Sequence, residues 1–234
     1  MDLLFDSVRS AVLLLLSSDP ELWLIVWVSL KVSGLSTLIA SLFGVPAGFF
    51  IAYRRFPGKR FVLTCLNTLL ALPTVVIGLL VYSFISRRAV FGFLGLLYTQ
   101  EAMVIGQVIL ITPLVTSLTI AAISRIDNRY RRTALTLGAT ELQMALVIVR
   151  EARFGIGAAI IAAFGRVIAE VGISMMLGGN ARGFTRTMTT AMALEYDKGE
   201  FVLAVALGIT LLGIAFVLNM LFHLLQGRSH ADSL

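Results

Sequence analysis

Charged residues are scarce in this sequence of 234 residues: Asp, Glu, Lys and Arg make up only 14%, whereas 58% of positions are hydrophobic. The mean hydropathy is +0.94. Soluble domains carry about 25% charged residues, so the composition excludes an ordinary water-soluble domain and indicates an integral membrane protein. The net charge of +6 would also suit a nucleic-acid-binding protein. However, the Lys and Arg residues lie between long apolar runs, which is the pattern of a membrane protein.

Cysteine and histidine are nearly absent. Cys65 is the only cysteine and lies within an apolar run, so no disulfide can form inside the chain. His223 and His230 are the only histidines, and the sequence contains neither G-x-S-x-G nor H-E-x-x-H. We therefore expect no catalytic residue, no metal site and no cofactor. The P-loop pattern G-x-x-x-x-G-K-[ST] is missing too, so the chain does not bind ATP in that way.

Long apolar segments, in contrast, are abundant. A helix needs about 20 apolar residues to cross roughly 30 Å of hydrocarbon, and five segments reach that length. They lie at about 27–53, 61–86, 102–123, 156–176 and 201–226. The sequence thus predicts an all-α fold, a polytopic membrane protein with about five transmembrane helices. No internal repeat is apparent, which favours a single transmembrane domain over residues 1–234.

The first apolar stretch begins at Leu22 and is longer than one span requires. Its beginning is expected in the membrane interface, with Trp23 and Trp27 at headgroup depth and Lys31 reaching outward. Residues 11–18 are apolar but too few to span the bilayer. They favour a peripheral helix over a signal segment or an extra short span.

The loops between the predicted spans differ in charge. The first and third loops are rich in arginine, the second has little charge, and the fourth mixes both signs. The basic residues are Arg54, Arg55, Lys59 and Arg60 in the first loop and Arg125, Arg129, Arg131, Arg132, Arg150 and Arg153 in the third. Under the positive-inside rule these two loops are cytoplasmic. The N-terminus then lies on the outer side of the cell membrane and the C-terminus on its cytoplasmic side.

The third loop, at about residues 124–155, has the signals of two short helices. Asp127 can cap the first helix, and Gly138 can end it because glycine adopts a left-handed backbone without a Cβ clash. Thr140 and Gln143 have the spacing of a capping box at the start of the second. Helical spacing places one apolar set on a single side, namely Leu135, Leu142, Leu146 and Val149. We expect an amphipathic elbow, which either rests on anionic lipid or docks on a partner.

The elbow resembles the cytoplasmic coupling loop of permease subunits from binding-protein-dependent ABC importers. The core of that loop matches Ala134, Leu137, Gly138, Ala139 and Thr140, and its end matches Gly155 and Ile156. Arg132 and Thr133 stand where the family usually has Glu and Ala, and Arg150 stands where Pro is usual. The resemblance implies a type I importer permease fold with residues 132–134 and 137–140 as the ATPase-coupling segment. It also implies three partners: an ABC ATPase subunit, an extracytoplasmic oxyanion-binding protein and a second copy of the chain.

Two further stretches, residues 164–180 and 185–195, are similar to the oxyanion branch of these permeases and most similar to tungstate permeases. The resemblance implies import of an oxyanion, with tungstate favoured and molybdate or sulfate as alternatives. The candidate residues for the translocation route or gate in these stretches are Gly178, Gly179, Asn180, Thr185, Arg186, Thr187, Thr189 and Thr190. They supply N–H, hydroxyl and guanidinium donors for an oxyanion, although an external loop that docks a partner protein would have a similar composition.

Arg166 and Glu170 are the only charged residues well inside a predicted span. They are four residues apart and hence on one helical face, and pairing lowers the cost of burying each charge. The pair either locks helix packing or places Arg166 on the translocation route, where an anion would favour it. Small residues follow the same helix: Ala158, Ala162, Gly165, Ala169 and Gly172 form a stripe, with Ala159, Ala163 and Ser174 near the pair. We expect this helix to pack on both sides.

An ion-driven secondary transporter or a channel is the remaining alternative. Such transporters usually show inverted repeats and ionisable residues in several spans. Neither feature is apparent in this sequence. A chain without its own P-loop must take the energy for uphill transport from elsewhere, and a separate ATPase would agree with the coupling-loop resemblance.

Overall fold

The computed structural model describes residues 9–10, 13, 17, 19–54 and 56–231, and no strand occurs among them, in agreement with the all-α prediction. The peripheral helix predicted at 11–18 lies mostly outside the described residues. The elements are α2 (Pro20–Tyr53), α3 (Lys59–Leu70), α4 (Thr74–Ile85), the 3-10 turn η1 (Gly92–Leu94), α5 (Gln100–Ser124), α6 (Asn128–Thr136), α7 (Glu141–Glu151), α8 (Arg153–Ile168), α9 (Gly172–Gly178), α10 (Met188–Lys198) and α11 (Phe201–Ala231).

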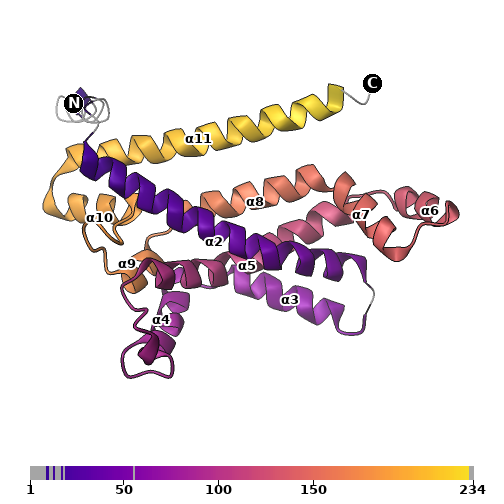
Figure 1. The fold of residues 1–234 in the computed structure, drawn as a ribbon, viewed down its shortest axis with the longest axis horizontal. Helices are drawn as coiled ribbons and strands as arrows, with labels where there is room; N and C mark the ends of the chain where they lie inside the picture. The colour runs from indigo at the N-terminus through magenta and orange to yellow at the C-terminus, as the bar shows by residue number, and fades with distance from the viewer. Residues whose placement is uncertain (1–8, 11–12, 14–16, 18, 55, 232–234) are drawn as a thin grey trace.

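The helices α2, α3, α5, α8 and α11 run along the long axis of the molecule, whereas α4 stands across it (Figure 1). In the described part of the chain, α2, α5 and residues 201–220 of α11 are each long and apolar enough to cross a membrane. The predicted spans at 61–86 and 156–176 are not single helices: α3 and α4 meet at a bend of 96°, and α8 and α9 at 60°. Five spans result if each bent pair counts as one.

The start of α2 is set by local capping. The Asp19 carboxylate accepts hydrogen bonds from the backbone N–H groups of Glu21, at 2.7 Å, and Leu22, at 3.4 Å. Pro20 occupies the first helical position, where its fixed φ favours the helix and its missing N–H costs nothing. For these reasons α2 begins several residues before the expected start of the span at 27.

The two breaks also have local causes. Pro73 has no N–H to donate and disfavours a helical conformation in the residue before it, so α3 ends at Leu70 and α4 begins at Thr74. In the second break, Oε1 of Glu170 accepts a hydrogen bond from the backbone N–H of Ile173 in the first turn of α9, at 3.4 Å. A free N–H group at membrane depth therefore finds a partner within the chain.

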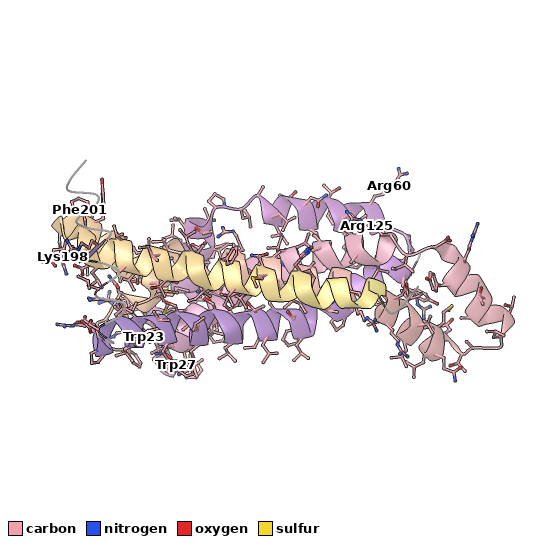
Figure 2. All side chains as sticks on the ribbon, turned by 90° about the horizontal axis from the view of Figure 1, so that it is seen from above. Trp23, Trp27, Arg60, Arg125, Lys198 and Phe201 are labelled. Carbon is pink, nitrogen blue, oxygen red and sulfur yellow. The ribbon has the colours of Figure 1, made fainter. Side chains whose placement is uncertain are left out.

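The two ends of the molecule differ in composition. Trp23, Trp27 and Lys198 lie at one end, whereas Arg60 and Arg125 lie at the opposite end (Figure 2). We call these the tryptophan end and the arginine end. Trp23 and Trp27 are 48% and 63% exposed, as expected for aromatic side chains in a membrane interface. The first and third loops, which were predicted to share one side of the membrane, both lie at the arginine end.

The contact between α2 and α5 is unusually close because glycine faces the partner helix. A Cβ added at Gly44 would lie 3.0 Å from Cβ of Val115, and one added at Gly48 would lie 2.7 Å from Cβ of Thr119. Without side chains at these two positions the helix backbones can approach, as in other membrane helix pairs with small residues at the contact.

A buried polar contact joins the same two helices to α9. The Gln107 side chain of α5 is 1% exposed. Its Oε1 accepts a hydrogen bond from the Ser36 hydroxyl of α2 at 2.9 Å, and its Nε2 donates one to Oγ of Ser174 in α9 at 3.3 Å. These bonds satisfy the amide in an apolar surrounding and fix the position of α9 relative to the α2–α5 pair.

The outside of the bundle is apolar. Leu38 and Leu42 of α2 are 68% and 69% exposed, and Leu212 and Phe216 of α11 are 72% and 69% exposed. Exposed apolar surface on this scale is unfavourable in water. The chain therefore needs a lipid or protein environment along its length.

Substitution Gly48→Ala should destabilise the bundle by about 1–3 kcal/mol, because the new Cβ would force α2 and α5 apart. The measurement is the midpoint of reversible unfolding in mixed detergent. Gly34→Ala in the same helix is the control, since an added Cβ there meets no atom within 4 Å. Equal midpoints for the two variants would contradict the close packing.

Candidate functional site

The elbow between α5 and α8 forms as the sequence predicted. Asp127 caps α6 by accepting a hydrogen bond from the Arg129 N–H at 2.9 Å. Gly138 has a φ of +76°, the left-handed conformation that ends the first helix. Thr140 and Gln143 form the capping box of α7: the Thr140 N–H donates to the Gln143 side chain at 2.8 Å, and the Gln143 N–H donates to the Thr140 hydroxyl at 3.3 Å.

The tip of the elbow is apolar and exposed. Leu137 is 81%, Leu142 72% and Leu146 62% exposed, and Leu135 is exposed beside them. Val149, predicted on the same side, instead packs half-buried against the core at the arginine end. Of the predicted ATPase-coupling residues, Thr133, Leu137, Gly138 and Thr140 are exposed, Ala134 and Ala139 are half-buried, and Arg132 lies within α6. An exposed apolar tip of this kind is unfavourable in water and needs a partner or a lipid surface to cover it.

The opposite face of α7 anchors the elbow to the bundle. Met144 and Ile148 are buried in a cluster with Ile123 of α5 and Ile156 of α8. At the end of α2, Arg54 forms an ion pair with Glu141 of α7 at 3.1 Å between nitrogen and oxygen. Movement of the elbow must therefore move the adjoining ends of α2, α5 and α8.

The two helices of the elbow are also tied to each other. Glu151, the last residue of α7, accepts a hydrogen bond from the Tyr130 hydroxyl of α6, and this contact raises the pKa of Tyr130. Ala134, on the inner side of α6, packs against the cluster at the arginine end. These contacts join α6 to α7 and to the core at the arginine end.

At the tryptophan end, the segment between α9 and α10 forms a layer of buried threonines. The Thr185 hydroxyl donates to the Gly178 carbonyl oxygen at 2.5 Å, and the Thr189 hydroxyl donates to the Glu170 carbonyl oxygen at 2.9 Å. Thr187 and Thr190 form a capping box at the start of α10. The structure thus brings the predicted threonines together, but their hydroxyls are used in bonds within the chain.

The other predicted residues of this segment shape the turn. Gly179 and Asn180 both have positive φ, +68° and +51°. An added Cβ at Gly178 would lie 2.5 Å from Sδ of Met103, so a larger residue there would displace the Met103 side chain. Nδ2 of Asn180 donates to the Thr190 carbonyl oxygen at 3.3 Å, while its Oδ1 is buried with no hydrogen-bond partner in the described part of the chain. A role for these residues in translocation stays a prediction.

Arg166 and Glu170 form the predicted ion pair, with 2.8 Å between Nη1 and Oε2. Their setting differs from the prediction, because α8 ends at Ile168 and Glu170 lies in the break before α9. The Glu170 side chain is 4% exposed, whereas that of Arg166 is 44% exposed. Glu170 thus joins α8, α9 and α10 through its carboxylate and its carbonyl oxygen, and Arg166 faces out of the single chain.

The expected packing of α8 on both sides is found on one side of the single chain. Ala159, Ala163 and Val167 are buried on that face. Ala162, Gly165 and Ala169, part of the predicted small-residue stripe, are exposed. Within the described residues, no helix of the same chain lies against these three positions, so the stripe is uncovered.

Sequence reasoning missed two groups of contacts. The first group is the pair of hydrogen bonds that joins Gln107 to Ser36 and Ser174, and the sequence signal for it was a lone amide inside the predicted span 102–123. The second is the ion pairing of Glu21 with Arg182 and Arg186, which joins residues far apart in the sequence. Glu21 gave no such signal, because an acidic residue in the first turn of a helix is common.

The described part of the chain combines apolar helices of membrane length with an exposed apolar elbow at one end and a folded threonine-rich layer at the other, which is the architecture of a polytopic membrane protein. The chain belongs to the family of binding-protein-dependent transport system inner membrane components, which matches residues 44–230. It is therefore a multi-pass inner-membrane permease and a transport subunit rather than an enzyme in its own right.

Individual relatives agree with this membership. A tungstate uptake system permease protein from Peptoclostridium acidaminophilum is 37% identical over 226 residues, which cover 97% of this chain and 99% of that protein. A molybdenum transport system permease protein from Escherichia coli (strain K12) is 30% identical over 186 residues, which cover 75% of this chain and 80% of that protein. Membership in the family argues against the alternative of an ion-driven secondary transporter.

A solved structure shares the fold. A chain of a bacterial alginate ABC transporter, solved in complex with a periplasmic protein that carries an alginate pentasaccharide, superposes with a TM-score of 0.74 at 19% identity. The match covers 92% of this chain and 82% of that chain. The predicted importer permease fold is thereby confirmed.

Substitution Arg166→Met should destabilise the protein by about 3 kcal/mol, because it leaves the buried Glu170 carboxylate without its cation. The double variant Arg166→Met/Glu170→Gln should recover most of that loss, since it removes both charges. The measurement is again detergent unfolding. Equal stability of the single variant and the unmodified protein would show that the pair does not support the break.

Proposed function

We propose that this chain is the membrane-spanning permease subunit of an ABC importer that moves an oxyanion into the cytoplasm, with tungstate as the favoured ion. The observation that carries the proposal is the elbow: a rigid, capped helical pair with an exposed apolar tip and a buried anchoring face. Full-length similarity to a tungstate permease, at 37% identity, supports the choice of ion. The similarity to a molybdenum permease is lower and keeps molybdate as an alternative, with sulfate as the second alternative for a tetrahedral dianion of similar size.

The elbow is proposed to face the cytoplasm and to bind an ATPase subunit. The arginine end would then be cytoplasmic, the tryptophan end extracytoplasmic, the N-terminus outside and the C-terminus inside, as the positive-inside rule predicts. In this arrangement Leu137, Leu142 and Leu146 enter a cleft of the ATPase, and residues 1–234 form one transmembrane domain. ATP is hydrolysed by the assembled complex, because this chain has no P-loop.

Two copies of the chain are proposed to form the conduit. The exposed small-residue stripe of Ala162, Gly165 and Ala169 supports this assignment, since such residues suit a close helix contact. The half-exposed Arg166 lies among them and is proposed to face the route of the ion. An extracytoplasmic oxyanion-binding protein would deliver the ion at the tryptophan end.

The structure suggests how a movement of the elbow reaches that end. The anchoring face of α7 holds the arginine ends of α2, α5 and α8. The helix α8 leads to the break at Glu170, whose hydrogen bonds reach α9 and α10. Closure of an ATPase dimer would thus pull the elbows together and shift the helices between two packed states.

Substitution Gly138→Val should abolish ATP-driven uptake in reconstituted vesicles, because a β-branched residue is strained at a φ of +76° and the two elbow helices would change direction. Membrane insertion, checked by fractionation, should be unchanged. Gly199→Val imposes the same strain, at a φ of +79°, at the tryptophan end and serves as the control. Normal uptake in the Gly138 variant would rule out docking through the elbow.

The proposal as a whole is tested by mild detergent purification from the native membrane. We expect a P-loop ATPase to co-purify, with ATP hydrolysis stimulated more by tungstate-loaded binding protein than by the molybdate- or sulfate-loaded form. Stronger stimulation by the molybdate- or sulfate-loaded binding protein would change the assigned ion but not the assignment of the chain to an importer. A chain that is isolated alone and without ATPase activity in several detergents would refute the importer assignment.

A further inference from the structure

The start of α2 is joined to the segment between α9 and α10 by a cluster of three charged residues at the tryptophan end. Nε of Arg182 donates to Oε1 of Glu21 at 2.7 Å, and Nη2 of Arg182 donates to Oε2 of the same carboxylate. Nη1 of Arg186 lies 3.7 Å from Oε1 of Glu21. Two guanidinium groups thus converge on one carboxylate.

The guanidinium donors of Arg182 and Arg186 differ in how fully they are hydrogen-bonded. The Arg182 side chain is 72% exposed and takes the carboxylate in a two-point contact, the strongest geometry for this kind of pair. The Arg186 side chain is only 12% exposed, and its distance to Glu21 is too long for a hydrogen bond. Nε of Arg186 is buried and has no hydrogen-bond partner in the part of the chain that the structure describes. A largely buried guanidinium with an unpaired N–H donor can bind an anionic oxygen.

The other carboxylates nearby do not pair with Arg186. The Asp19 carboxylate is occupied by the backbone N–H groups at the start of α2. Glu195 forms its own ion pair with Lys198, at 2.9 Å. Glu21 is therefore the carboxylate that competes for the arginines. Its side chain is 35% exposed and lies in the first turn of α2, so it can swing into solvent without unfolding the helix.

We propose that Arg182 and Arg186 form an oxyanion-binding site on the outer face of the permease, which the Glu21 carboxylate occupies when no ion is present. This inference rests on the proposed function for the class of ion, a tetrahedral dianion. A carboxylate and such a dianion both present a pair of oxygen atoms to a guanidinium, so one can replace the other. The dianion has additional oxygen atoms and charge, which allow it to contact the Arg186 guanidinium through Nη1 as well, where Glu21 Oε1 lies 3.7 Å away.

The site keeps Arg186 from the set that the sequence suggested but leaves out the threonines. The threonine hydroxyls of the segment are used within the chain, so the guanidinium groups remain as the available donors. Displacement of Glu21 would also remove the ion pairs between the start of α2 and the segment between α9 and α10, while Leu22, Ile25 and Val26 stay packed with α10. Arrival of the ion would thus loosen the contact between these two elements at the outer end.

The test measures tungstate binding directly on the full permease–ATPase complex in lipid nanodiscs, without binding protein and without nucleotide. Equilibrium dialysis followed by elemental analysis gives the bound ion. Glu21→Gln should bind tungstate about tenfold more tightly than the unmodified complex, because an attached competitor acts at an effective concentration in the millimolar range. Glu21→Gln/Arg186→Gln should lose the gain, and Glu200→Gln, the same charge change on an exposed residue of the same end, should bind as the unmodified complex does.

Two results would overturn the site. If an assembled Glu21→Gln complex shows no gain in tungstate binding, the cluster serves only to hold the start of α2 to the segment between α9 and α10. A change in affinity for the binding protein without any gain in ion binding would make the arginines a protein contact. If Glu21→Gln fails to assemble, Glu21→Asp keeps the charge but shortens its reach, and the same tightening is expected to a smaller degree.

ATP-driven uptake by the same variants separates this site from the proposed function. If the unmodified complex takes up tungstate but Glu21→Gln does not bind tungstate more tightly, the importer assignment stands and the proposed site is refuted. Absence of uptake with all three oxyanions would refute the importer itself, whatever the dialysis shows.

Discussion

The close packing of α2 against α5 is the contact on which the other parts of the molecule depend. Gly44 and Gly48 let the two backbones approach where any side chain would collide with Val115 or Thr119. The helix α5 runs directly into the elbow, and the end of α2 contacts the elbow through Arg54. A rigid pair of helices is therefore required to hold the elbow in place, because its short helices bury little surface of their own.

Two buried polar side chains inside the bundle, those of Gln107 and Glu170, each join several helices. A lipid environment offers no water to an unpaired group, so a buried amide or carboxylate must find its partners in the chain. Gln107 finds them on α2 and α9. Glu170 finds its partners on α8 and α9 and lends its carbonyl oxygen to α10. These contacts explain how a bundle of mostly apolar helices can contain two bent pairs and retain defined positions for them.

The two ends of the permease differ in the kind of contact they offer, which is apolar at the elbow and polar at the tryptophan end. The elbow exposes leucines, so the partner contact proposed for it would depend on burial of apolar surface, which is non-directional. The tryptophan end is held by ion pairs and hydrogen bonds, among them those of Glu21 with Arg182 and Arg186. Such bonds are directional and exchangeable, which suits the anion site proposed there.

Composition and local pattern were sufficient for several features, because each depends on a few neighbouring residues. Membrane helices follow from apolar length, and the elbow follows from Asp127, Gly138 and the Thr140–Gln143 box, all of which act within one or two turns. The same local pattern also predicted the pairing of Arg166 with Glu170, although not its position in a break.

The sequence by itself determined that the chain is a helical membrane protein with a capped elbow, since hydropathy and capping are local properties. Only the tertiary structure decided which donors stay available. It placed the threonine hydroxyls in bonds within the chain and brought Glu21 to two arginines more than 150 positions away. The physical reason is that hydrogen-bond satisfaction in a bundle is set by which helices meet, and such contacts depend on packing of the whole chain rather than on any short stretch of it.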